Sequence, residues 1–301
     1  MTVLVNGNAI AKKILADTKA EVSALKKNGI TPTLGVILVG NHAPSRIYVR
    51  KKRAAAKKVG INFILESLKR TITTNELIKA VETMQRVHNL SGLIIQLPLP
   101  LHIADAPVLS AINPALDVDC LTAVNLGKLV IGAHTILPPT ANAIMSVLKE
   151  LRVELVGKNV TIIGTGALVG KPLAIMMINE QATVTTCNCF TSALADKTKG
   201  ADIIVSGVGR RNIIRGNMIK QGAIVIDAGV EFIDQVMYGD VNREEVEKKA
   251  RSLTPTPGGI GPITVALLLQ NTARCARNNA SPSQGEVKNS QCFNQKITLP
   301  L

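Results

Sequence analysis

The sequence predicts an α/β protein built from two α/β domains. Along the 301 residues, short apolar runs alternate with helical patterns, and strand–helix–strand alternation builds parallel sheets joined by crossover helices. A stretch rich in Pro, Asn and Gly between residues 112 and 142 separates one such series from a second. The chain is long enough for two domains with their own cores, so we place a domain boundary in this stretch.

The first half contains three predicted strands and three predicted helices. The helix expected over Ser45–Val59 has no internal Gly or Pro, is rich in alanine and is followed by Gly60, which is typical of a helix end. The expected strands are 33–40, 61–68 and 91–98, and the expected helices lie near 8–28, 45–59 and 74–88.

The second half repeats the scheme with four strands, whose continuous apolar character indicates a sheet covered on both faces. The expected strands are 159–164, 182–186, 201–207 and 222–229, and the expected helices are 143–151 and 263–277. After residue 277 the polar segment NNASPSQGEVKNSQ contains few core-forming side chains. We therefore expect a mobile tail over 278–301.

The composition indicates a basic protein with an aliphatic core. The formal net charge is +14, and aromatic residues make up only 2% of the chain, with no Trp. A basic surface favours anionic partners such as phosphates or carboxylate-rich small molecules. Nucleic-acid binding needs stacking aromatics or a known motif among the cations, and the sequence shows neither. We therefore expect no nucleic-acid partner. No apolar run approaches the ~18 residues of a membrane span, so we also expect no membrane partner.

The cysteines and the first residues favour a cytoplasmic protein. The five cysteines are scattered, and Cys187 and Cys189 form C-x-C without a second pair at zinc-ligand spacing. We expect reduced thiols and no metal site. The start, MTVLVNGNAIAKKI, lacks the basic beginning and apolar core of a signal peptide.

One lysine in the basic segment PSRIYVRKKRAAAKKVG shares the apolar face of its helix. At about 100° per residue, Tyr48, Lys52, Ala55 and Val59 fall on one stripe, while other cations of the segment fall on the opposite face. The Lys52 stem could lie along the core edge with its ammonium in water. Alternatively, Lys52 is a partly buried, reactive lysine, and the helical spacing alone does not decide between the two.

A glycine-rich segment follows the first strand of the second half. IIGTGALVGKP places Gly164, Gly166 and Gly170 between that strand and a helix, one residue longer than the usual dinucleotide fingerprint. Such a turn allows close approach of a pyrophosphate to helix N-terminal amides. We expect a Rossmann-type sheet that binds a dinucleotide, with a purely structural turn as the alternative. The next strand ends in TTCNCFTS, without the carboxylate or arginine that would distinguish NAD from NADP.

Three further segments carry candidate ligand-binding groups. Gln96 ends a predicted parallel strand, where α/β sites lie, although it could be an ordinary loop amide. Asp117 and Asp119 in DVDC could cap a turn or accept hydrogen bonds from a ligand, and no third ligand of matching type suggests a metal. The loop TPTPGGIGPIT (254–264) allows close backbone approach to a flat ligand, unless it is a plain linker.

These segments, in this order, resemble one family: the bifunctional methylenetetrahydrofolate dehydrogenase/cyclohydrolase of folate one-carbon metabolism. The similarity covers about residues 1–277. YVRKK resembles the family's Tyr-x-x-x-Lys helix, IIQLPLP its Gln-Leu-Pro-Leu-Pro segment, and DVDCLTAVNLGKL its Asp-Val-Asp-Gly stretch. GTGALVGKP is similar to the cofactor loop, and PGGIGPIT to the C-terminal signature.

The resemblance implies two reactions at one folate site between the two domains: oxidation of 5,10-methylenetetrahydrofolate to 5,10-methenyltetrahydrofolate, and its hydrolysis to 10-formyltetrahydrofolate. It implies a folate-binding catalytic domain of residues 1–140 plus the helix 263–277, and a Rossmann-type domain of residues 141–262. NADP is the expected cofactor, with NAD as the alternative. A homodimer and a role in purine biosynthesis are also implied.

The resemblance assigns roles residue by residue. Lys52 would transfer protons in the hydrolysis, Gln96 would orient its nitrogen, Tyr48 would pack against the folate, and Asp119 would bind the donors of the pterin. The implied catalytic residues are Tyr48, Lys52, Gln96 and Asp119. The implied substrate-binding residues add Ile95, Leu97, Pro257, Gly258, Gly259, Ile260 and Gly261. The implied cofactor-binding residues are Gly164, Thr165, Gly166, Gly170, Cys189 and Val230.

The chain departs from the family pattern at three places. Cys120 stands where the family has Gly, and LPPTANAIM (137–145) replaces a Pro-Cys-Thr-Pro sequence. Thr165 and Cys189 stand where the family has an arginine and a serine that contact NADP, which puts the cofactor preference in doubt. Two other classes remain as alternatives: a different Rossmann oxidoreductase acting on a small keto or amino acid, and a basic nucleic-acid or regulatory protein that binds a dinucleotide without catalysis.

Overall fold

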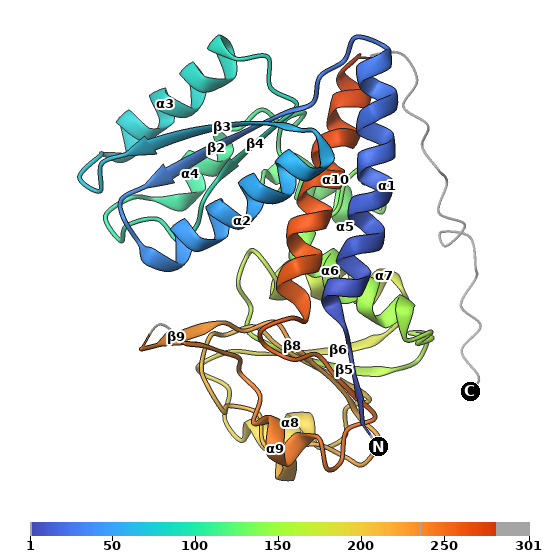
Figure 1. The fold of residues 1–301 in the computed structure, drawn as a ribbon. Helices are drawn as coiled ribbons and strands as arrows, with labels where there is room; N and C mark the ends of the chain where they lie inside the picture. Colours follow the sequence, from blue (N-terminus) through green and yellow to red (C-terminus); the bar gives the residue numbers. More distant parts are fainter. Residues whose placement is uncertain (1, 235, 281–301) are drawn as a thin grey trace.

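The computed structural model describes residues 2–234 and 236–280. Within these residues the chain forms a three-stranded parallel sheet, a six-stranded parallel sheet and a two-stranded antiparallel ribbon. The two parallel sheets lie at opposite ends of the molecule, and two long helices run along one side of both (Figure 1). The predicted α/β architecture is therefore confirmed. No helix among the described residues is long and apolar enough to cross a membrane.

The first sheet has the strand order β3 (Asn62–Leu68), β2 (Thr33–Val39), β4 (Gly92–Ile95). The central strand β2 is buried throughout its length. Helix α2 (Ala43–Val59) packs on one face of this sheet, and α3 (Thr74–Val87) packs on the other together with α4 (Asp105–Ser110). Helix α3 begins with a capping box in which Thr73 and Glu76 exchange hydrogen bonds. Strand β4 ends just before Gln96.

The second sheet has six parallel strands. Their order is β1 (Val3–Leu4), β11 (Ser252–Leu253), β8 (Ile224–Asp227), β7 (Ile203–Ser206), β5 (Asn159–Ile163), β6 (Thr183–Cys187). One face carries α6 (Pro139–Glu150) and α7 (Gly170–Asn179), and α5 (Ala123–Val130) packs against α7. The other face is covered by shorter elements: α8 (Leu194–Thr198), η1 (Gly216–Met218) and α9 (Arg243–Val246).

Two helices join the two sheets into one body. Helix α1 (Gly7–Lys27) and helix α10 (Ile260–Ala280) run side by side along the molecule (Figure 1). Near its start, α10 contributes Ile260 and Ile263 to the core of the second sheet, and further along it contributes Leu268 and Leu269 to the core of the first. The same helix therefore packs against both sheets.

Several element boundaries differ from the sequence-based prediction. Helix α6 begins at Pro139 rather than at residue 143, because proline is tolerated in the first helical turn, where no intrahelical N–H bond is lost. Helix α10 begins at Ile260 and continues to Ala280, so residues 278–280 are helical and the rest of the predicted tail lies outside the described residues. The strand predicted over 91–98 ends at Ile95.

Candidate active site

A cavity of about 1100 Å³ lies between the two sheets. Its walls are α1, α2, the carboxyl ends of β4 and β8, the start of α7 and the loop that leads into α10. It contains every residue that the resemblance assigns to substrate binding. These are Tyr48, Lys52, Ile95, Gln96, Leu97, Asp119, Pro257, Gly258, Gly259, Ile260 and Gly261. Thr140, within the departing segment 137–145, lines it as well.

Lys52 points into this cavity from α2. Its side chain is half-buried, and Nζ donates a hydrogen bond of 3.0 Å to Oε1 of Gln96. Arg50, Arg53 and Lys57 are exposed on the opposite face of the helix. Of the two alternatives for Lys52, the structure therefore shows the partly buried lysine with a specific partner. Tyr48 lies one turn earlier on the same face, and burial raises the pKa of its hydroxyl.

Gln96 is held in one orientation by its neighbours. Its Nε2 donates a 2.7 Å hydrogen bond to the carbonyl of Leu97, which leaves Oε1 to accept from Lys52. The amide comes from the residue directly after β4, where the chain leaves the sheet. A side-chain amide whose oxygen and nitrogen both have hydrogen-bond partners can orient the lysine nitrogen toward a ligand.

Burial and mutual attraction set the charges of the Lys52–Asp119 pair. Burial lowers the pKa of Lys52, and the Asp119 carboxylate opposes this shift. Burial likewise raises the pKa of Asp119, and Lys52 opposes that shift. A lysine at its ordinary pKa of ~10.4 is protonated near neutral pH. The lowered pKa gives Lys52 a larger neutral fraction, which general-base chemistry requires.

Asp117 and Asp119 lie in different surroundings, which their spacing in DVDC alone does not distinguish. Asp117 is fully buried and accepts hydrogen bonds from the backbone N–H groups of Leu121 and Thr122 and from the Asn125 side chain. It therefore organises the turn that leads into α5. Asp119 lines the cavity. Among the described residues no group of three or more His, Cys, Asp or Glu side chains could hold a metal ion.

The departure at Cys120 affects backbone strain and leaves the cavity lining unchanged. Its φ angle is +57°, in the left-handed region that glycine adopts without penalty. A residue with a Cβ, such as this cysteine, incurs a cost of about 1–2 kcal/mol there. The thiol packs in the core beside Cys275, and burial raises its pKa to about 12. Cys120 is therefore an uncharged core residue and supplies no nucleophile.

The glycine-rich turn after β5 has the geometry that a pyrophosphate requires. Gly164 has φ +103°, and a Cβ at Gly170 would overlap the Gly164 carbonyl oxygen, so the turn lies directly against the first residue of α7. A Cβ at Gly166 would meet nothing within 4 Å, so space remains open above the turn. The residues present therefore fit a dinucleotide phosphate at the helix N-terminus.

Of the three remaining predicted cofactor residues, one lines the cavity and two do not. Val230, after β8, lines it, whereas Thr165 and Cys189 do not. Cys189 is exposed in the loop after β6, next to Phe190, which is 91% exposed. This loop is fixed by hydrogen bonds between Asn188 and Thr191. Neither neighbour of Cys189 supplies a cation.

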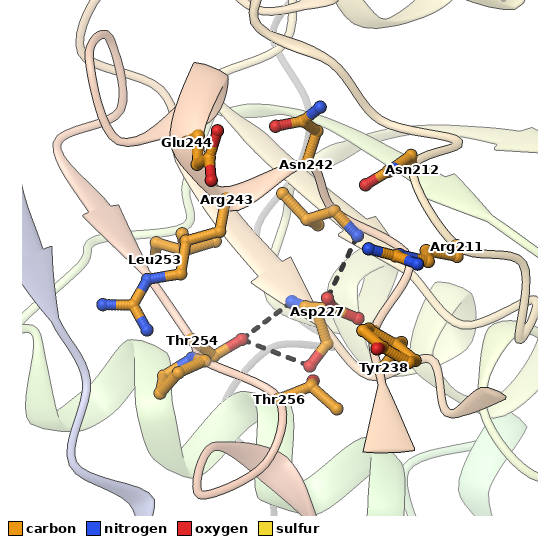
Figure 2. Close-up of a pocket in the computed structure, with 13 residues that line it drawn as sticks. Arg211, Asn212, Asp227, Tyr238, Asn242, Arg243, Glu244, Leu253, Thr254 and Thr256 are labelled. Carbon is orange, nitrogen blue, oxygen red and sulfur yellow. Dashed lines mark hydrogen bonds between the residues drawn. The ribbon is translucent and has the colours of Figure 1, made fainter. Parts of the chain in front are cut away.

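Asp227 is a site residue that the sequence analysis missed. It ends β8, lines the cavity and also borders a smaller pocket of about 280 Å³ (Figure 2). Its carboxylate accepts the backbone N–H groups of Gly229, Asp240 and Val241, and its own N–H donates to the Thr254 hydroxyl. Its position at the end of a buried strand, in GAIVIDAG, was the available signal.

A second buried carboxylate stands beside it. Asp240 accepts hydrogen bonds from the Ser206 hydroxyl and from the backbone N–H groups of Val208 and Arg210. Together the two carboxylates fix the loops after β7 and β8, including Val230. Burial, with a contribution from Asp240, raises the pKa of Asp227 to about 6.

This shift predicts a pH-dependent contribution to stability. The folded pKa of about 6 lies above the ~3.9 of an ordinary aspartate, so between these pH values the folded state binds more protons than the unfolded state. The contribution of Asp227 to the free energy of unfolding is therefore greatest below pH ~4 and decreases by about 3 kcal/mol as pH rises through ~6. We expect the free energy of unfolding of wild type minus that of D227N, measured by urea unfolding, to decrease by this amount as pH rises through ~6. Carboxyl ¹³C NMR on the wild type should give a midpoint near 6, and a midpoint near 4 would contradict the prediction.

Comparison with known proteins gives concordant matches over nearly the whole chain. The family model described as tetrahydrofolate dehydrogenase/cyclohydrolase, catalytic domain, matches residues 5–119. The model described as tetrahydrofolate dehydrogenase/cyclohydrolase, NAD(P)-binding domain, matches residues 138–280. The bifunctional protein FolD of Nautilia profundicola is 43% identical over 281 residues, which cover 93% of this chain and 99% of that protein.

Solved structures agree with these matches. The bifunctional FolD methylenetetrahydrofolate dehydrogenase/cyclohydrolase from Campylobacter jejuni superposes with a TM-score of 0.89 at 38% identity, covering 93% of this chain and 100% of that one. The Trypanosoma brucei enzyme, solved in complex with NADP cofactor and an inhibitor, has a TM-score of 0.89 at 36% identity, with 93% and 99% covered.

Proposed function

The chain belongs to the tetrahydrofolate dehydrogenase/cyclohydrolase family, and we propose that its two activities share the cavity described above. The protein is a bifunctional enzyme that oxidises 5,10-methylenetetrahydrofolate with NAD(P) and hydrolyses the resulting 5,10-methenyltetrahydrofolate to 10-formyltetrahydrofolate. The observation that carries the proposal is the half-buried Lys52, hydrogen-bonded to Gln96 in a cavity that also reaches Val230.

The oxidation requires a held geometry rather than a protein nucleophile. When bound, NAD(P)⁺ would supply the acceptor for the hydride that leaves the methylene carbon of the folate. Asp119 accepts hydrogen bonds from the N–H donors of the pterin, and Tyr48 packs against the adjoining aromatic ring. The Pro257–Gly261 loop brings its backbone against the flat pterin.

The hydrolysis requires proton transfer, which we assign to Lys52. Water adds to the methenyl carbon, and neutral Nζ of Lys52 accepts the proton that the water loses. The bond between this carbon and N5 then breaks as the lysine returns its proton to N5, and the hydroxyl proton of the adduct passes to solvent, which leaves the formyl group on N10. Oε1 of Gln96 keeps Nζ aimed at the substrate throughout.

The two activities are tested together on purified protein. Mixing with 5,10-methylenetetrahydrofolate and NADP should produce reduced cofactor, followed by decay of the methenyl absorbance as the ring opens. Absence of both signals in a folded protein would contradict the assignment. Turnover of a keto or amino acid without folate would support the other oxidoreductase class.

We also propose the division into a catalytic domain, 1–140 with 263–277, and a Rossmann-type domain, 141–262. The two separate sheets and their separate cores support it. Strand β1 is an exception within this scheme, because residues 3–4 pair with β11 at the edge of the second sheet. The first strand thus ties the N-terminus of the catalytic domain to the other sheet.

NADP is the proposed cofactor, with weak discrimination against NAD. Thr165 and Cys189 are neutral, and Arg211 lies with its guanidinium 4.0 Å from the Tyr238 ring centroid in the smaller pocket. A charge-assisted phosphate contact contributes about 1.5–3 kcal/mol, or roughly tenfold to hundredfold. We expect the ratio of kcat/KM for NADP over NAD to lie below about a hundredfold.

The measurement compares both cofactors at fixed methylenetetrahydrofolate. T165R serves as the matched variant, because it restores a cation next to the glycine turn and should raise the ratio about tenfold. A wild-type ratio above about a thousandfold would reveal another phosphate-binding cation, and a preference for NAD would contradict the proposal.

We further propose a cytoplasmic homodimer that supplies one-carbon units for purine biosynthesis. The ribbon of β9 (Glu231–Ile233) and β10 (Val236–Tyr238) supports the dimer, because it projects from the second sheet (Figure 1) and exposes 38% of Ile233 and 51% of Val236. Sedimentation equilibrium should show a dimer for the wild type. The V236E variant should dimerise more weakly.

A further inference from the structure

Helix α10 carries a fully buried asparagine that the proposed chemistry does not use. Asn271 is 0% exposed, and it lies between Leu269 and Ala273, which pack in the core of the first sheet. Burying a side-chain amide costs free energy unless its polar atoms are hydrogen-bonded, and an apolar side chain at the same position would incur no such cost. An asparagine here therefore indicates specific hydrogen-bond partners.

The amide nitrogen of Asn271 binds two segments that are distant in the sequence. Nδ2 donates a 2.9 Å hydrogen bond to the carbonyl of Val118 and a 2.8 Å hydrogen bond to the carbonyl of Leu137. Because carbonyl oxygens only accept hydrogen bonds, Nδ2 rather than Oδ1 must face them. Oδ1 has no hydrogen-bond partner within the described part of the chain. The side chain therefore acts through its two N–H donors.

Both of these carbonyls belong to segments that line the cavity. Val118 directly precedes Asp119, which lines the cavity. Leu137 comes three residues before Thr140, which lines the cavity from the first turn of α6. Helix α10 itself follows the glycine-rich loop that forms another wall of the cavity. Asn271 thus connects three cavity-lining segments at one point.

One side of α10 lies against the turn of residues 117–120, which we call the DVDC turn. Asn271, Cys275 and Asn279 are spaced by four residues, so they fall on the same side of the helix. Cys275 packs in the core beside Cys120, and Nδ2 of Asn279 donates a 3.4 Å hydrogen bond to the carbonyl of Ala115. Asn271 supplies the buried hydrogen bond on this side, and its acceptor directly precedes the carboxylate that we propose binds the pterin.

We propose that Asn271 is a positioning residue for Asp119, whose carboxylate it keeps directed toward the pterin and Lys52. The Val118 carbonyl and the N and Cα atoms of Asp119 belong to one planar peptide unit. A hydrogen bond to this oxygen therefore fixes the plane from which the Asp119 side chain departs. The inference rests on the proposed function, in which Asp119 binds the pterin.

Replacing Asn271 with alanine should reproduce the effects of a displaced Asp119. We expect the KM for methylenetetrahydrofolate to rise by about tenfold, because a misplaced acceptor makes weaker charge-assisted hydrogen bonds. The Kd of the free dinucleotide should stay unchanged. The rise of the hydrolysis rate with pH should move to lower pH, because Asp119 raises the pKa of Lys52 and this attraction weakens with distance.

The matched control is T272V, at the next position of the same helix. Thr272 is also 0% exposed, and its hydroxyl donates a 3.0 Å hydrogen bond to the Leu268 carbonyl within α10. The substitution removes a buried hydrogen bond and leaves those to the DVDC turn in place. Urea unfolding should show lower stability for both variants, whereas only N271A should change the folate KM and the pH profile.

A second variant keeps the test decisive if N271A folds poorly. Asn271→Asp preserves the shape of the side chain, but a carboxyl group has at most one donor and cannot bind both carbonyls. It should raise the folate KM and move the pH profile in the same direction as N271A.

The double variant N271A/D119A tests whether Asn271 acts through Asp119. If it does, alanine at position 271 should change neither the folate KM nor the pH profile once the carboxylate is absent, so the two substitutions are non-additive. Additive effects would overturn the inference. Equal changes in N271A and T272V, or a wild-type KM and pH profile in N271A, would overturn it as well. A folded wild type without turnover of either folate would instead overturn the proposed function.

Discussion

Replacing Lys52 with methionine is expected to lower the rate of methenyltetrahydrofolate hydrolysis by at least about a hundredfold, within the range that positioned proton transfer contributes. The methionine keeps an apolar stem of similar length in the half-buried position, so the cavity retains its shape. Substrate KM should change much less than kcat, because Asp119, Tyr48 and the Pro257–Gly261 loop supply most of the proposed folate contacts. Methenyltetrahydrofolate should accumulate during the dehydrogenase reaction.

The pH profile distinguishes a proton-transfer role from a structural one. In the proposed mechanism neutral Lys52 is the active form, so wild-type hydrolysis should rise with pH up to the pKa of Lys52, which burial holds below its ordinary value. The K52M variant should lack this rise of the hydrolysis rate with pH. The control is K57M, on the exposed face of the same helix, which should hydrolyse like wild type. Wild-type hydrolysis by K52M would exclude Lys52 as the base.

Much of this site was predictable because its residues follow simple periodicities. The 3.6-residue repeat of α2 placed Lys52 on the same side as Tyr48, and the structure has both in the cavity. The end of a parallel strand placed Gln96, which lines the same cavity, and the glycine turn after β5 predicts where a dinucleotide would bind. The local sequence also gave every strand of the two sheets that spans four or more residues.

What the sequence did not reveal depends on contacts between distant segments. Strand β1 has two residues and forms only because β11 presents an edge to pair with it, some 250 residues later. Asp117 and Asp119 are two positions apart in DVDC, and only the packing of the following turn shows which one is buried in a hydrogen-bond network. The pair Asp227–Asp240 likewise depends on the return of the chain after the β9–β10 ribbon.

The interaction between Asp119 and Lys52 joins binding and proton transfer in one pair of residues. Asp119 raises the pKa of Lys52 against the effect of burial. In the proposed mechanism its carboxylate thus has two effects: it accepts hydrogen bonds from the substrate, and it reduces the neutral fraction of Lys52. Removing it should affect these two properties in opposite directions.

Replacing Asp119 with alanine is expected to weaken folate binding by roughly tenfold to hundredfold, because donors of the pterin lose a charged acceptor worth about 1.5–3 kcal/mol. The affinity for the free dinucleotide should stay unchanged, since the glycine turn lies after β5 in the other sheet. In the same variant the pKa of Lys52 should decrease, so the rising limb of the hydrolysis profile should move to lower pH. Asp117→Ala is the contrasting substitution: it removes three buried hydrogen bonds, so it should lower the free energy of unfolding instead. Equal loss of folate and dinucleotide affinity in D119A, with an unshifted pH profile, would mean that Asp119 supports the fold and does not touch the substrate.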